Sequence, residues 1–313
     1  MRILVTGGAG YIGSVLVPML LDAGHHVRVL DILRKGGQGL FPLFANPRLE
    51  FVHGDVRDED KLREALRGSD AIIHLAAIVG YPACRRDPWL AMEVNYGGTA
   101  ALNRQRHRGQ LLLFASSLSN YGHAADGLCT EESEPTPITI YGQSKIRAEQ
   151  EVLSSDDNVI VFRPATAFGL SPQMRLDLLF NEFVYRAVKE RFLAVYQPYF
   201  MRAFVHVRDF AGAFLFALEH ADRMRSQVFN LGDESLNVTK GDLAERVRRR
   251  LDFELHFSEA GEDPDKRNYA VSFAKLKSVG FSTQVTIEEG IDELARGYQV
   301  LDIPNPYANA SYY

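Results

Sequence analysis

The chain has 313 residues, of which 46% are hydrophobic and 24% charged, and its formal net charge is −5 at pH 7. These proportions are typical of a globular enzyme, and the acidic balance argues against nucleic acid or an anionic membrane as a partner. No apolar run approaches the roughly 18 residues of a membrane span, and two cysteines with nine scattered histidines predict no metal site, so we expect a cytoplasmic, metal-free protein.

Seven short apolar runs recur along the chain, with helical patterns between them. Several runs are apolar almost throughout, as strands buried on both faces are. Their alternation with helices predicts an α/β fold with a doubly wound parallel sheet. The predicted strands span residues 3–5, 27–30, 49–52, 71–75, 111–115, 159–162 and 228–231, and the clearest helices span 14–21, 176–188 and 210–221.

The regular alternation of strands and helices stops after Phe162, and this change divides the chain into two parts. We expect a nucleotide-binding domain from residues 1–164 plus about 205–233. A smaller mixed region from about 165–204 plus 234–313 would close over the strand ends and hold the substrate. In such sheets, ligands bind outside the carboxyl ends of the strands.

Residues 6–13 read Thr-Gly-Gly-Ala-Gly-Tyr-Ile-Gly, between the first strand and the first helix. In that setting Gly7, Gly10 and Gly13 let the backbone approach a pyrophosphate, and the helix N-terminus offers N–H groups to its oxygens. The alternative is a tight turn in which glycine serves shape alone.

Acidic residues follow the next two strands. The carboxylate of Asp31 can accept hydrogen bonds from the adenosine ribose and would repel a 2′-phosphate, which favours NAD over NADP. The alternative for Asp31 is a capping or turn aspartate. Asp55, after the third strand, would meet the adenine or serve equally well as a turn residue.

Three polar residues in the middle of the chain suggest proton transfer. Tyr141 and Lys145 are four apart and would share one helix face, where an ammonium favours the phenolate and lowers the tyrosine pKa. A phenol tuned in this way can take a proton from an alcohol. Ser117 follows a buried strand and can orient a substrate oxygen, although a plain loop serine is the alternative.

Asn95 is a further polar candidate. Its side chain would hold the local backbone or a water molecule in place, and a polar contact inside a helix is an equal alternative.

Taken together, these motifs resemble those of the extended short-chain dehydrogenase/reductase family, in particular its NAD-dependent sugar-nucleotide epimerases and dehydratases. The resemblance implies a Rossmann-type sheet and covers essentially the whole chain. It rests on TGGAGYIG at 6–13, GDVRD at 54–58, HLAA at 74–77, SSLSNYG at 116–122, YGQSK at 141–145, FRPATAFG at 162–169, RAFVHVRDF at 202–210 and DPDKRNY at 263–269.

The resemblance implies roles for individual residues. Tyr141 would be the catalytic base, Lys145 the anchor of the nicotinamide ribose, and Ser117 their partner. NAD would be held by Tyr141 and Lys145 and by Gly7, Gly10, Tyr11, Ile12, Gly13, Asp31, Asp55, Val56, Leu75, Ala76, Ala77 and Asn95. The nucleotide-sugar would contact Val79, Gly80, Ser117, Ser119, Arg175, Asn181, Arg202 and Arg267.

Two of these arginines, Arg202 and Arg267, match positions that bind the sugar-nucleotide diphosphate in the family. A planar guanidinium suits a phosphate, although a surface ion pair is the alternative for each. The chain departs from the dehydratases, which carry Asp and Glu where it has Leu118 and Ser119, so 4,6-dehydration is not expected.

A narrower likeness points to enzymes that act on GDP-linked heptoses and oxidise C4. It rests on residues 77–88 and 171–177, and it would also place Cys84 near the sugar, although a small packed side chain is the favoured interpretation of that cysteine.

We therefore expect NAD-dependent oxidation at C4 of a nucleotide-sugar, by a 4-epimerase or a C4-dehydrogenase, and the resemblance implies a homodimer. The alternatives are a non-catalytic NAD-binding regulatory protein and a reductase of small non-nucleotide carbonyls.

Overall fold

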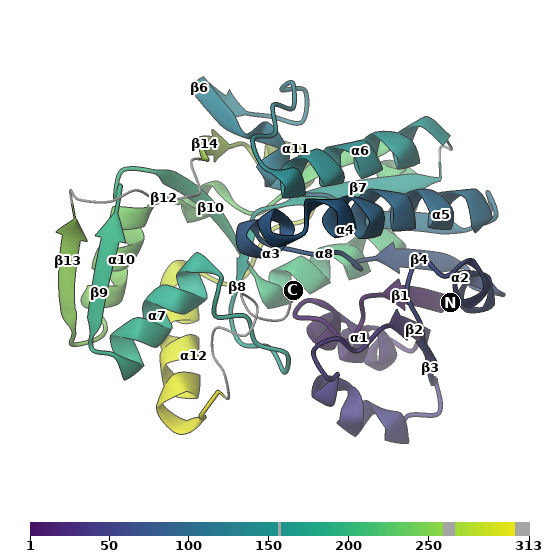
Figure 1. Cartoon of the computed structure of the whole chain (residues 1–313), viewed down its shortest axis with the longest axis horizontal. Helices are drawn as coiled ribbons and strands as arrows, with labels where there is room; N and C mark the ends of the chain where they lie inside the picture. The colour runs from purple at the N-terminus through teal and green to yellow at the C-terminus, as the bar shows by residue number, and fades with distance from the viewer. Residues whose placement is uncertain (156–157, 259–266, 304–313) are drawn as a thin grey trace.

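A seven-stranded sheet forms the centre of the computed structural model, which describes residues 1–155, 158–258 and 267–303 (Figure 1). All neighbouring strands in it run parallel, in the order β11-β7-β5-β4-β1-β2-β3. The predicted doubly wound sheet and its seven strands are thereby confirmed. The strands are β1 (Arg2–Thr6), β2 (His26–Asp31), β3 (Leu49–His53), β4 (Ala71–His74), β5 (Leu111–Ala115), β7 (Val159–Pro164) and β11 (Gln227–Leu231).

Successive strand residues point to opposite faces of the sheet, so each face has its own core. Ile3 and Val5 belong to the core beneath helices α1 (Gly13–Asp22) and α8 (Val207–Glu219). Leu4 belongs to the core on the other face, beneath α2 (Glu59–Leu66), α5 (Gly98–Gln105) and α6 (Ile140–Ser155). Because helices cover both faces, the carboxyl edge of the sheet remains the place where loops gather.

Smaller elements surround this layered centre. The strands β6 (His123–Cys129) and β14 (Asn268–Val271) pair in parallel beside α6, and α11 lies next to β14 (Figure 1). The remaining short helices are η1 (Gln38–Ala45), α3 (Tyr81–Arg86), α4 (Pro88–Met92), η2 (Glu93–Gly97), η3 (Leu118–Tyr121), α9 (Ala221–Met224) and α11 (Ala274–Ser278).

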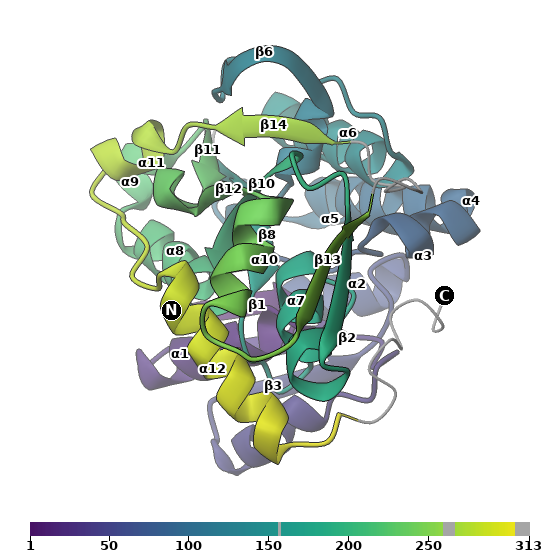
Figure 2. The same cartoon turned by 90° about the vertical axis from the view of Figure 1, so that its left-hand side faces the viewer.

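A second group of elements lies beyond the carboxyl edge and has its own core (Figure 2). Phe180, Leu243 and Ile291 come from its three helices, and the ring of Phe168 stacks on that of Phe180 at 4.0 Å. The elements are β8 (Thr166–Phe168), β9 (Phe192–Tyr196), β10 (Met201–His206), β12 (Asn237–Thr239), β13 (Glu254–Ser258), α7 (Leu179–Lys189), α10 (Lys240–Arg248), α12 (Ile287–Val300) and η4 (Glu234–Leu236).

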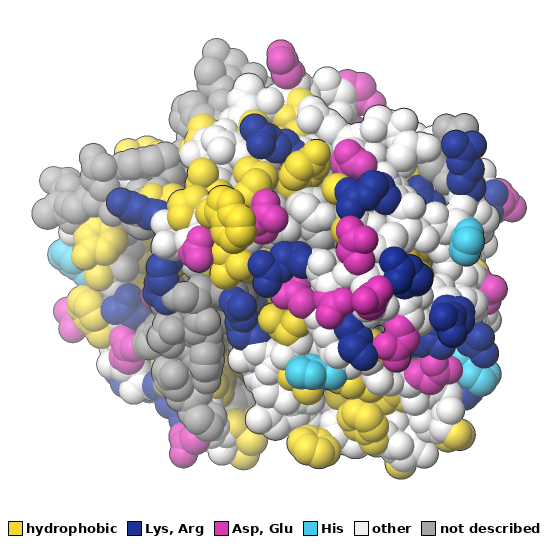
Figure 3. Space-filling model, turned by 45° about the vertical axis from the view of Figure 1, so that its right-hand side comes forward, with side chains coloured by type: hydrophobic (Ala, Val, Ile, Leu, Met, Phe, Trp, Pro, Cys, Tyr) yellow, Lys and Arg dark blue, Asp and Glu magenta, His cyan; other side chains and the backbone are white. Residues whose placement is uncertain are grey.

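Two predicted helices begin at other residues than expected. The helix predicted over 210–221 begins at Val207, because the His206 ring accepts a hydrogen bond from the Arg208 N–H and caps it there. The helix predicted over 176–188 begins at Leu179. Within the described residues, no helix is both long and apolar enough to cross a membrane. Basic and acidic side chains are interspersed over the face in Figure 3.

Candidate functional site

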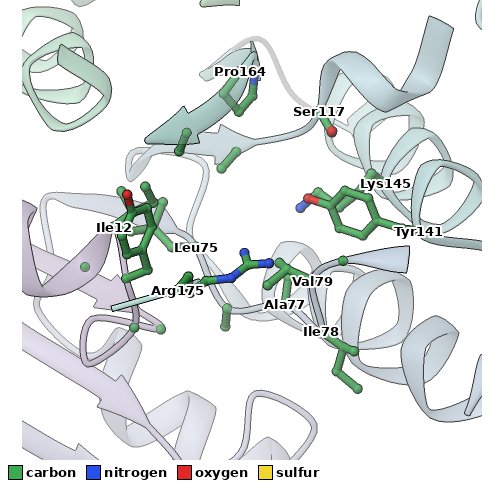
Figure 4. Close-up of a pocket in the computed structure, with 18 of the residues that line it drawn as sticks. Ile12, Leu75, Ala77, Ile78, Val79, Ser117, Tyr141, Lys145, Pro164 and Arg175 are labelled. Carbon is green, nitrogen blue, oxygen red and sulfur yellow. The ribbon is translucent and has the colours of Figure 1, made fainter. Parts of the chain in front are cut away.

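A cavity lies where the carboxyl edge of the main sheet faces the second group of elements. Loops that follow β1 to β5 form one side of it, and β8, β10 and the segment around Arg175 form the other. Figure 4 shows Ile12 and Leu75 at one end of this pocket and Ser117, Tyr141 and Lys145 at the other. The two motifs that are far apart in sequence therefore line a single cavity.

The glycine loop has two kinds of glycine. A Cβ on Gly7, whose φ is +73°, would stand 2.7 Å from the Ala76 nitrogen, and one on Gly13 would stand 2.5 Å from the Gly8 Cα. These two positions need glycine because the loop packs on itself and on the segment that follows β4. A Cβ on Gly10 would meet only the Gly7 oxygen, at 3.3 Å, and would otherwise project into space. Gly10 therefore keeps the cavity side of the loop open, as a bound pyrophosphate requires.

Asp31 lies at the end of β2, on the cavity wall. Its carboxylate accepts hydrogen bonds from the N–H groups of Ala9, at 3.0 Å, and Leu33, at 2.8 Å. Burial raises the carboxyl pKa, and the backbone hydrogen bonds oppose that shift. Asp31 thus has the turn role offered as the alternative, while its position on the cavity wall also suits it to a ribose.

The rest of the cavity's first end is apolar and backbone-rich. Asp55 lies on it and binds the Arg57 guanidinium, with Oδ2 2.7 Å from Nη2. The apolar part of this wall fits a flat base, and its backbone-rich part fits a diphosphate. Asp31, the acid that ends the second strand, fits a ribose, so the chain's own residues suit a dinucleotide. Of the predicted cofactor set, the wall includes Tyr11, Ile12, Val56, Leu75, Ala76 and Ala77.

Asn95 is the predicted cofactor residue that lies outside the cavity lining. It is 1% exposed, and its amide accepts from the Ile78 N–H at 2.7 Å and donates to the Ile78 carbonyl at 3.0 Å. A further bond, at 3.0 Å, reaches the Ser144 hydroxyl on α6. These hydrogen bonds hold the Ile78 backbone, and the contact with NAD that was expected of Asn95 stays a prediction.

Ser117, Tyr141 and Lys145 come together as predicted. Tyr141 and Lys145 share one face of α6, and Ser117 follows β5 and caps η3, accepting from the Ser119 N–H at 3.1 Å. The Ser119 hydroxyl donates to the Ser117 oxygen at 2.7 Å. Lys145 is 3% exposed and its Nζ lies 4.3 Å from the centroid of the Phe114 ring.

The charge state of this group differs from the expected one. Burial raises the pKa of Tyr141 to about 12, further helped by the Cys84 thiol, while Arg175, a hydrogen bond with Ser117 and Arg267 lower it. Burial also lowers the pKa of Lys145 to about 7. The predicted lowering of the tyrosine pKa is absent in the described structure, because the loss of hydration on burial outweighs the groups that lower this pKa, and Lys145 is not one of those groups.

Arg175 extends across the pocket toward Val79 (Figure 4). Its guanidinium makes a two-pronged ion pair with Asp177, at 2.6 and 3.2 Å. The pair lies beside Gly80. A Cβ added to Gly80 would stand 3.4 Å from the Arg175 Nη2 and 3.5 Å from the Asp177 Oδ2. Of the predicted sugar-side residues, the lining includes Val79, Gly80, Ser117, Ser119, Arg175, Arg202 and Arg267.

Asn181 is the predicted substrate residue outside that lining. It is fully buried and binds the Gly169 N–H at 3.0 Å, the Arg175 carbonyl at 2.9 Å and the Tyr11 hydroxyl at 3.1 Å. Tyr11 in turn donates to the Gly169 carbonyl at 2.7 Å. Asn181 therefore ties the glycine loop to the segment that carries Arg175.

Several residues near the site were not predicted from sequence. Lys35 lines the cavity, and burial lowers its pKa to about 8. Asp177 pairs with Arg175, a contact that the Arg-x-Asp spacing could have suggested. Glu149 lies one helical turn beyond Lys145, and the i, i+4 spacing was visible in the sequence.

Cys84, which the narrower likeness placed near the sugar, is 1% exposed, and its thiol donates to the Ile78 carbonyl at 3.4 Å. It has the burial and contact of the packed side chain that was the favoured interpretation.

A Rossmann-type sheet with a glycine loop and a Ser-Tyr-Lys group in one cavity defines a dinucleotide-dependent enzyme of the short-chain dehydrogenase/reductase type. Residues 3–232 match the NAD dependent epimerase/dehydratase family. The chain belongs to this family and uses NAD.

Individual relatives agree with this assignment. A UDP-glucose 4-epimerase of Halalkalibacterium halodurans is 32% identical over 260 residues, which cover 74% of this chain and 75% of the relative. The solved UDP-glucose 4-epimerase of Thermus thermophilus, in complex with NAD, has a TM-score of 0.82 at 26% identity and covers 96% of this chain and 99% of its own. The dTDP-glucose 4,6-dehydratase of Streptomyces venezuelae, with NAD bound, has a TM-score of 0.81 at 28% identity, over 96% of this chain and 97% of its own.

Proposed function

We propose that the protein oxidises a nucleotide-sugar at C4 with NAD, as a 4-epimerase or a C4-dehydrogenase. The observation that carries the proposal is the single cavity that joins the glycine loop and Asp31 to Ser117, Tyr141 and Lys145. In this proposal residues 1–164 plus about 205–233 hold NAD, and about 165–204 plus 234–313 hold the sugar. Residues 259–266 and 304–313 of the second part, and with them most of the DPDKRNY motif, lie outside the described residues.

Each reacting residue has a distinct task in this proposal. Tyr141 accepts the proton of the C4 hydroxyl, Ser117 orients that oxygen, and Lys145 binds the nicotinamide ribose. When bound, NAD supplies the hydride acceptor, and its oxidised ring adds a positive charge that favours the tyrosinate. The tyrosine pKa of about 12 in the protein alone already includes the lowering by Arg175 and Arg267, so the extra charge of the oxidised ring is what brings Tyr141 toward its basic form.

The charge of the cavity supports an anionic substrate. Its lining carries six basic side chains, Arg34, Lys35, Lys145, Arg175, Arg202 and Arg267, against the two carboxylates Asp31 and Asp55. Arg202 is 7% exposed, and its Nη1 donates to the carbonyls of Met201 and Arg267 at 2.9 and 2.5 Å. A sugar-nucleotide diphosphate matches this excess of positive charge, whereas a small neutral carbonyl does not. The intact Ser-Tyr-Lys group argues against a purely regulatory role.

The residues beside Ser117 argue against loss of water from the sugar. Leu118 and Ser119 line the cavity where dehydratases of the family carry an acidic pair. A leucine and a serine offer no carboxylate to take the C5 proton or to protonate the C6 hydroxyl. We therefore propose that the product is a C4 epimer or a 4-keto sugar that keeps its C6 oxygen.

Incubation with GDP-linked and UDP-linked hexoses and heptoses in deuterium oxide, followed by NMR, tests the reaction. Inversion at C4 with NAD unchanged selects the epimerase, and a 4-ketone with NADH accumulating selects the dehydrogenase. A preference for GDP-heptose would support the narrower likeness within the family. Deuterium at C5 together with a new C6 methyl signal would refute the proposal in favour of a dehydratase.

We also propose that the protein works as a cytoplasmic homodimer, which the family resemblance implies. Light scattering on the purified chain measures its mass in solution directly. A monomer at micromolar concentration, with or without NAD, would contradict this part of the proposal.

A further inference from the structure

A buried charged group lies behind the catalytic residues and takes no part in the mechanism above. Glu149 on α6 is 2% exposed, and Arg163 at the end of β7 is 5% exposed. The Arg163 guanidinium grips the Glu149 carboxylate, with Nη2 2.5 Å and Nε 3.1 Å from Oε1. The Ser116 hydroxyl donates to Oε2 at 2.5 Å, and the Asn120 amide donates to it at 3.1 Å. The carboxylate is thus fixed from two strands and η3.

This group lies next to both halves of the catalytic arrangement. Ser116 immediately precedes Ser117, so its bond to Glu149 holds the turn that presents the Ser117 hydroxyl. Glu149 follows Lys145 by four residues, which places the two side chains on one face of α6. The carboxylate therefore lies behind both the orienting serine and the lysine.

Glu149 is the acidic residue among the groups around Lys145, and the other titratable groups there are neutral near neutral pH. Burial lowers the pKa of His74 to about 3, and raises those of Cys84 and Tyr141 to about 12, so these three are neutral. Burial of Lys145 disfavours its ammonium, and Glu149 is the larger of the two influences that oppose this. The groups around the pair are His74 on β4, Cys84 on α3, Tyr141 and Glu149 on α6, with Arg175 and Arg267 facing Tyr141.

We propose that Glu149 is a positioning residue that keeps Lys145 in its charged form and holds the Ser116–Ser117 turn, with Arg163 fixing the carboxylate in place. The inference rests on the proposed function, since it concerns the same lysine and serine. A charged Lys145 donates to the ribose of NAD and favours the tyrosinate, whereas a neutral one does neither well.

The test is the pH dependence of NAD binding, measured by calorimetry from pH 5.5 to 9 without any sugar. Affinity should fall as the pH rises through the pKa of Lys145, and Lys145→Met should abolish that step. In Glu149→Gln the midpoint should move down by about one pH unit, because the ammonium loses its nearby opposite charge. Glu151→Gln, on the same helix but bonded to Asn103, is the matched control and should leave the midpoint unchanged.

Two further variants keep the test decisive. Lys35 also lines the cavity, so Lys35→Met should retain the Lys145 step and show that it belongs to Lys145. If Glu149→Gln fails to fold because Arg163 is left buried and unpaired, the double variant Glu149→Leu with Arg163→Met removes both charges and should also lower the midpoint. Circular dichroism checks the fold of each variant.

The results separate this inference from the proposed function. A midpoint in the Glu149 variants equal to that of the wild type, or no Lys145-dependent step at all, would overturn the inference. A chain that shows the expected shifts but turns over no nucleotide-sugar would refute the proposed function and leave the role of Glu149 standing.

Discussion

The sharpest test of the cofactor end of the cavity is the replacement of Asp31 by asparagine. NADP differs from NAD by a 2′-phosphate, which would approach the Asp31 carboxylate on the cavity wall. Two unit charges about 5 Å apart, at an effective dielectric constant of about 20, repel by roughly 3 kcal/mol, or a little over 100-fold in affinity. Arg34 and Lys35 line the same cavity and offset part of this, so we expect wild-type discrimination of about 100-fold.

Asp31→Asn should reduce this discrimination to about tenfold or less, and calorimetry with both dinucleotides at one pH and ionic strength measures it. The ratio of the two affinities is the quantity to compare, because asparagine has one acceptor oxygen for the two N–H groups that Asp31 now binds. That loss weakens both complexes alike. Asp55→Asn, on the same wall after the next strand, is the control and should leave the ratio within about twofold of the wild type. Equal wild-type affinities for NAD and NADP would refute the reasoning.

Four further substitutions test other parts of the site. Tyr141→Phe should reduce kcat by about 10²–10⁴-fold while the Kd for NAD stays within about threefold, and near wild-type kcat would mean that another group is the base. Gly10→Ala should leave the Tm unchanged but weaken NAD binding, whereas Gly13→Ala should lower the Tm; equal effects on both would contradict the two glycine roles. Asn181→Ala should cost about 1–3 kcal/mol of stability and raise KM for the sugar, as unfolding and steady-state kinetics would detect.

The sheet was predictable because its evidence is local. A strand buried on both faces is apolar at every position, so runs such as 111–115 are visible without knowledge of their neighbours. The glycine loop and Asp31 were predictable for the same reason, since a short turn and one strand end fix their positions. Tyr141 and Lys145 needed only the helical repeat.

Contacts between distant loops were not predictable in this way. Lys35 and Arg175 lie 140 positions apart in the sequence, and only the folded chain brings them close together. The charge state of Tyr141 was predicted incorrectly for a related reason. The sequence shows that a lysine follows four residues later, but it does not show that burial removes water from both groups, which raises the pKa of the tyrosine and lowers that of the lysine.

The two asparagines that lie outside the cavity show how its walls are held. A primary amide has an acceptor and two donors, so it can bind a loop's N–H and carbonyl groups as a neighbouring strand would. Asn95 does this for Ile78 beside the catalytic helix, and Asn181 does it for Gly169 and Arg175 on the substrate side. Loops at a sheet edge lack strand partners, and a buried backbone group without a partner costs about 1–3 kcal/mol. The same device on both sides therefore fixes the loops that form the cavity walls.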